Sequence, residues 1–129
     1  MRDTFVLLTA QEDAAGVQGR ILALDEITGD EHFRYFTLGD CVFGVGTSGS
    51  VLQDYDEDEL REIRERLGEF EPLLIEYQNM DCARALLGRC LADARGIVDT
   101  NYGDLLDYPE VLRRIRERPG WTLRQTGAG

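Results

Sequence analysis

Residues 72–100 constrain the fold of this chain more than any other stretch. "PLLIEY" (72–77) predicts a buried strand that opens with proline. Asn79 then caps a predicted helix, whose apolar residues recur at helical spacing and end at Gly96. "IVDT" (97–100) predicts a second strand. Because strand, helix and strand follow one another so closely, we expect a βαβ unit with parallel strands and a right-handed crossover.

The flanking residues predict the remaining elements. Short apolar or alternating segments in the first half predict strands over residues 4–8, 32–38 and 41–46. Residues 19–27 fit either a strand or two helical turns, and we favour the strand.

Two further helices are expected. One runs from Asp56 to a glycine stop at Gly68, with an acidic first turn. The other starts near Asp107-x-x-Glu110, an aspartate version of the capping box, and ends at Gly120.

The chain of 129 residues is therefore expected to form a single α+β domain over residues 1–129. An antiparallel N-terminal meander joins a βαβα half in one mixed sheet, with helices packed on it.

The charge balance restricts the class of partner. The chain carries 25 acids against 14 bases, a net charge of −11. This charge argues against nucleic acid and anionic lipid as direct partners, because both need a basic footprint. It is compatible with a basic protein partner, which a negative field attracts and steers. Solubility alone is the competing explanation of the charge.

The N-terminus and the cysteines predict a cytosolic protein. The first residues hold an acid and only a short apolar segment, unlike a signal peptide, and no apolar run is long enough to span a bilayer. Cys82 and Cys90 lie eight residues apart on one predicted helix, roughly 12 Å, which is too far for a disulfide. Cys41 is left over, and a single histidine, His32, leaves too few ligands for zinc. We therefore expect buried, reduced thiols and no cofactor.

Three short patterns invite a functional interpretation that their context does not favour. "GVGTSG" (44–49) fits G-x-G-x-x-G, but no helix opens directly after it, so a loop after a strand is the simpler interpretation. "DYDEDE" (54–59) lacks the glycine of a calcium loop and is interpreted as a solvated helix start or an acidic docking patch. His32 is the only possible imidazole base, and no nucleophile motif accompanies it.

"IVDTNYGDLLDY" (97–108) concentrates acids and tyrosines at the end of a predicted strand. Asn101 and Gly103 are typical of a turn with left-handed backbone, Asp107 is expected to cap the last helix, and Asp99 can satisfy turn amides. Exposed tyrosine beside exposed acid is also typical of protein interfaces. The stretch is thus either a well-capped connection, a protein-docking loop, or a catalytic or metal site.

Residues 73–115 resemble small bacterial proteins of the toxin-immunity kind. The resemblance lies in an apolar strand, an amphipathic helix, a strand ending in a D-x-N-[FY]-G turn, here Asp99 to Gly103, and an acid-capped helix. It implies a small, non-enzymatic α+β protein that binds and neutralises a cognate toxin. No site residue carries over, because such proteins use divergent surfaces.

We therefore expect an acidic cytosolic protein-binding inhibitor that occludes the active site of a basic, nuclease-type toxin. Two alternatives remain: a phage-type inhibitor that mimics the charge of DNA, and a small enzyme that uses carboxylates or His32. The predicted partner-binding residues are Asp54, Tyr55, Asp56, Glu57, Asp58, Tyr102, Asp104 and Asp107.

Overall fold

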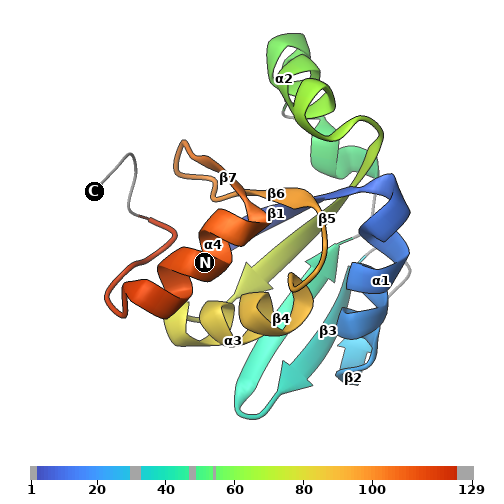
Figure 1. Cartoon of the computed structure of the whole chain (residues 1–129). Coiled ribbons are helices and arrows are strands. Elements are labelled where there is room, and N and C mark those ends of the chain that lie inside the picture. The colour runs from blue at the N-terminus through green and yellow to red at the C-terminus, as the bar shows by residue number, and fades with distance from the viewer. Residues whose placement is uncertain (1–2, 30–32, 47–48, 54, 125–129) are drawn as a thin grey trace.

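The computed structural model describes residues 3–29, 33–46, 49–53 and 55–124 (Figure 1). Asp54 and His32, both singled out from the sequence, lie outside the described residues, as does the tail after Arg124. The elements along the chain are β1 (Asp3–Ala10), α1 (Gln11–Leu22), β2 (Asp25–Gly29), β3 (Phe33–Leu38), β4 (Cys41–Gly46), the 3₁₀ turn η1 (Gly49–Leu52), α2 (Glu57–Leu67), β5 (Phe70–Tyr77), α3 (Met80–Cys90), β6 (Gly96–Asp99), β7 (Leu105–Asp107) and α4 (Tyr108–Glu117).

The strands form one seven-stranded sheet in the order β2-β3-β4-β5-β1-β6-β7. Together with the helices this confirms the predicted α+β class. Each neighbouring pair is antiparallel, in contrast to the mixed sheet expected from the sequence. β5 and β6 do run in the same direction, because both pair antiparallel with β1. β1 lies between them, so the βαβ unit is split around the N-terminal strand.

The two faces of the sheet carry separate apolar cores. Phe5 and Leu7 of β1 point to one face, where α1, α3 and α4 pack and supply most of the main core. Val6 and Leu8 point to the other face, where α2 packs with Ile63 and Leu67. Figure 1 shows α2 set apart from the other three helices. Within the described residues, no helix has both the length and the apolar character needed to cross a bilayer.

The prediction of a strand over residues 19–27 is wrong, because α1 runs to Leu22 and β2 starts only at Asp25. The helical stripe of α1 consists of Ala14, Val17 and Ile21, which are all buried. Two helix-weakening glycines and exposed residues between these positions hide the stripe in the sequence. Tertiary packing on the sheet, rather than intrinsic propensity, therefore decides this element.

Cys41 and Cys82 form a disulfide with a Cα–Cα distance of 5.6 Å, so the prediction of reduced thiols is wrong for these two residues. In the β4–β5 register Gly44 faces Glu76. Continuing that register by three residues brings Cys41 level with Asn79, just before α3. Cys90 is the remaining free thiol; it is buried, and burial raises its pKa to about 11.

The glycines of the G-x-G-x-x-G pattern have a structural role. Gly44 and Gly46 lie within β4, directly opposite Tyr35 and Phe33 of β3. A Cβ on Gly44 would lie 2.7 Å from the Phe33 Cζ atom. Two glycines in this strand therefore make room for an aromatic ring across it, and the next α-helix, α2, begins only at Glu57, after the short η1.

Candidate functional site

The two acid-rich segments that the sequence singled out meet at one groove. The start of α2 and the turn between β6 and β7 line an open groove of about 450 Å³. We call it the acidic groove; its described lining residues are Asp56, Asp58, Glu59, Glu62, Arg66, Gly103, Asp104 and Leu105. Five carboxylates thus share this groove with one guanidinium group.

The acids at the start of α2 have a local structural reason to be there. Asp56 is the N-cap, and its Oδ1 accepts a hydrogen bond from the backbone N–H of Glu59 at 2.8 Å. The Glu59 side chain accepts in return from the backbone N–H of Asp56, which completes a capping box. Asp58 adds a third carboxylate near the positive end of the helix dipole. All three side chains remain exposed, so capping fixes the helix without burying its charge.

The turn after β6 is held by its own side chains, as the sequence predicted. Asn101 and Gly103 both adopt positive φ angles, of 64° and 100°. Asp99 Oδ1 accepts from the backbone N–H of Asn101 at 2.9 Å. The Asn101 amide donates to the Thr4 hydroxyl of β1 at 2.8 Å. The groove wall that carries Asp104 is therefore anchored to β1, an interior strand of the sheet.

Tyr55 links the two walls of the acidic groove. Its hydroxyl donates a hydrogen bond to Asp99, and its half-buried ring packs against the core beneath α2. Burial, and then the nearby Asp99 carboxylate, raise the pKa of Tyr55 far above its ordinary value. Tyr55 thus fixes the chain just before α2 against the turn after β6.

Tyr102, also predicted to bind a partner, does not line the acidic groove. It is 38% exposed, and its hydroxyl donates to Asp3 Oδ1 at 3.0 Å. The guanidinium of Arg124 lies 5.8 Å from the ring centroid, at cation–π distance. Tyr102 belongs to a different polar cluster, at the start of β1.

Arg66 connects α2 to the start of α4. Its Nη2 lies 2.7 Å from Asp107 Oδ1, and its Nη1 lies 3.7 Å from Glu62. Asp107 occupies the N-cap position of α4, but its side chain makes no capping hydrogen bond, so the predicted aspartate capping box is wrong. The reason is competition, since the Asp107 carboxylate pairs with Arg66 instead. Glu57, the remaining predicted residue, lines a shallow hollow along α2 itself rather than the groove.

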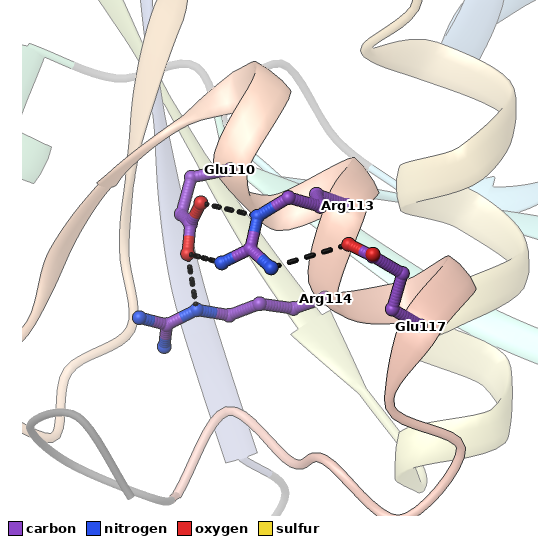
Figure 2. Close-up of polar contacts among 4 residues, drawn as sticks. All are labelled: Glu110, Arg113, Arg114 and Glu117. Carbon is purple, nitrogen blue, oxygen red and sulfur yellow. Dashed lines mark hydrogen bonds and ion pairs between the residues drawn. The ribbon is translucent and has the colours of Figure 1, made fainter.

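Glu110, the other half of the expected capping box, belongs to an ion network along α4 (Figure 2). Its carboxylate accepts from Nε of Arg113 at 2.9 Å and from Nε of Arg114 at 2.8 Å. Arg113 also donates to Glu117 at 3.1 Å. The hydrogen bonds from Arg113, and then those from Arg114, lower the pKa of Glu110 to about 2. Two arginines of this helix are therefore already paired with carboxylates, which leaves less unpaired positive charge on its surface.

Most of the groove carboxylates are exposed side chains rather than a compact ligand cluster. Among the residues that the structure describes, no group of three or more His, Cys, Asp or Glu side chains is placed to hold a metal ion. Asp56, Asp58, Glu59 and Glu62 are exposed side chains along one helix. Such an arrangement can receive the arginine or lysine side chains of a partner.

Comparison with known proteins gives no match: no family model, no curated protein and no solved structure is similar to this chain.

Proposed function

We propose that this protein is a non-enzymatic, acidic inhibitor that binds a basic protein partner through the acidic groove. The resemblance over residues 73–115 makes an immunity protein that neutralises a cognate, nuclease-type toxin the specific form of the proposal. The observation that carries it is the meeting of two acid-rich segments, about forty residues apart in the chain, at one groove.

Charge supports this proposal in two ways. A net charge of −11 attracts a cationic partner over long range and raises the rate of encounter. The only cation in the described groove lining, Arg66, already pairs with Asp107 and Glu62. The other carboxylates of the groove then face the partner, and a nuclease held there has its nucleic-acid surface covered.

The DNA-mimic alternative receives less support. A mimic needs carboxylates in uninterrupted rows at phosphate-like spacing. On α2 the acids alternate with Arg61, Arg64 and Arg66 instead. A small enzyme that uses carboxylates would need two of them held in a cleft, whereas those at the start of α2 are exposed.

The cytoplasmic location expected from the sequence has to be weighed against the disulfide. The disulfide between Cys41 and Cys82 weighs against it, because such bonds persist mainly in oxidising compartments. Binding of a toxin in an oxidising compartment, outside the cytosol, would be compatible with both the disulfide and the acidic groove.

The test compares two variants of equal net charge. Asp58→Asn/Glu62→Gln removes two groove carboxylates and leaves the capping box of α2 intact. Asp25→Asn/Asp40→Asn removes two exposed carboxylates from β2 and from the β3–β4 turn, outside the groove. The partner is the product of the neighbouring gene, or a basic protein captured from the native host and then purified.

We expect the association rate of the native protein to fall at least about tenfold between roughly 50 and 500 mM salt. The groove variant should associate more slowly than the control variant and protect the host less well when the partner is co-expressed. Association that is indifferent to salt, or equal rates for the two variants, would contradict the proposal.

A further inference from the structure

A second cavity, of about 230 Å³, lies where the start of β1, the end of β5 and the start of α3 meet the C-terminal segment. We call it the terminal pocket; its described lining residues are Asp3, Tyr77, Gln78, Asn79, Met80, Thr122, Leu123 and Arg124. None of these residues lines the acidic groove, so the pocket is a separate feature of the molecule.

Tyr77 gives this pocket a hydroxyl donor that is not used by the described residues. Its side chain is only 3% exposed and packs on Phe5, yet its hydroxyl forms no hydrogen bond with the described residues. The hydroxyl lies within electrostatic reach of Asp3, Tyr102 and Arg124, on the side where the cavity opens. Burial, and then Asp3, raise the pKa of Tyr77 to about 12, so the group stays protonated and can donate. The hydroxyl can therefore donate to a group held in the cavity.

A second donor in the wall is only weakly satisfied. The backbone N–H of Leu123, a fully buried residue, reaches Met80 Sδ at 3.4 Å. A thioether sulfur is a poor acceptor, so a better one would be preferred. The first turn of α3 offers further hydrogen-bond donors, because the Asn79 side chain caps only the N–H of Cys82. Within the described residues, the N–H groups of Met80 and Asp81 at this helix end have no side-chain cap.

Arg124 supplies the positive charge of the pocket. Its Nε and Nη2 both bind Asp3 Oδ2, at 3.0 and 2.6 Å. Asp3 also accepts from Tyr102, so its charge is shared between two donors. The Asp3–Arg124 pair is neutral overall, and the helix dipole of α3 then leaves the pocket with a positive bias. Donors therefore prevail over acceptors at this cavity.

We propose that the terminal pocket binds a small oxyanion, the carboxylate or phosphate group of a compact ligand. The Tyr77 hydroxyl, the Leu123 N–H and the first turn of α3 donate to the oxyanion, and the Arg124 guanidinium faces it. The cavity volume admits inorganic phosphate or a small organic acid but no nucleotide. This binding is independent of the proposed inhibitor function and of the acidic groove.

The test is an NMR titration of the full chain with inorganic phosphate and, separately, with acetate, at constant ionic strength. The amide signals of Met80 and Leu123 report on the pocket. Tyr77→Phe removes one hydroxyl from the wall, and Arg124→Gln removes the charge from an exposed residue. Tyr35→Phe is the matched control, because it removes a tyrosine hydroxyl from β3, away from the pocket.

We expect a saturable shift of both amides with at least one of the two probes, and the responding probe identifies the oxyanion class. Affinity should fall about tenfold or more in Tyr77→Phe and in Arg124→Gln, because each loses a bond to a charged ligand. It should be unchanged in Tyr35→Phe. The proposal is overturned if neither probe gives a saturable shift, or if Tyr77→Phe and Arg124→Gln bind as the native protein does. Should Tyr77→Phe fail to fold, Arg124→Gln alone decides the outcome.

Discussion

The disulfide between Cys41 and Cys82 should dominate the stability of this protein. It joins β4 to the first turn of α3 and closes a loop across a sequence separation of 41 residues. A loop of this length removes about 13 cal/mol/K of entropy from the unfolded chain, or about 4 kcal/mol at 25 °C. Domains have a total stability of only about 5–15 kcal/mol. Reduction should therefore remove a large part of the stability, and lower the Tm by about 15 °C for a chain of this size.

The assay is thermal unfolding followed by circular dichroism, with and without a phosphine reductant. Alkylation in denaturant counts the free thiols: one before reduction, from Cys90, and three after it. The double variant Cys41→Ala/Cys82→Ala should melt near the reduced protein and be insensitive to reductant. Three reactive thiols before reduction, or equal melting temperatures with and without reductant, would refute the reasoning.

Other perturbations test separate features of the fold. Because the pKa of Glu110 is lowered to about 2 in the folded state, its ion network stabilises the protein above the ordinary value of 4.5 and loses that effect as the pH falls towards 2. Glu110→Gln should cost about 1 kcal/mol at neutral pH and flatten acid unfolding curves over this range. Tyr55→Phe should lower the free energy of unfolding in denaturant by about 2 kcal/mol, because Asp99 loses a donor in a half-buried position. Gly96→Ala should destabilise by about 2 kcal/mol or more, since its Cβ would lie 2.7 Å from the Leu8 carbonyl oxygen. Gly88→Ala, in open space on α3, should instead be neutral or slightly stabilising by the same measurement.

The elements that the sequence predicts well are those with strong periodicity. The helix from Asp56 and the order strand, helix, strand over residues 72–100 are confirmed, although α3 ends at Cys90, well before the expected Gly96. The element over residues 11–22 was missed, because its apolar stripe is thin and interrupted by glycine. β7 was missed because three residues are too few for a pattern. Local signals therefore identify elements that carry their own amphipathic face, and fail where packing on the sheet makes the decision.

Contacts between distant segments were predicted least well. β1 inserts between β5 and β6, and no local signal in residues 72–100 indicates this. The pairing of Cys41 with Cys82 depends on the same sheet register, so cysteine spacing alone could not reveal it. Of the predicted partner-binding residues, Asp56, Asp58 and Asp104 line the acidic groove, whereas Glu59 and Glu62 line it and were not predicted. The meeting of the two acidic segments at one groove depends on α2 packing on the second face of the sheet, which only the fold determines.

Ion pairing is tighter at some carboxylates of this protein than at those of the acidic groove. Glu26 and Glu110 are held by arginine at 2.6 and 2.8 Å, and both pairs show lowered carboxylate pKa values. In the acidic groove, Asp58 lies 3.5 Å from Arg61 and Glu62 lies 3.7 Å from Arg66. Such long, exposed pairs contribute little to stability, so breaking them on association costs little. Under the proposed function, Asp58 and Glu62 are therefore the groove carboxylates that a cationic partner can engage most easily, whereas Asp107 beside the groove is held by Arg66 at 2.7 Å.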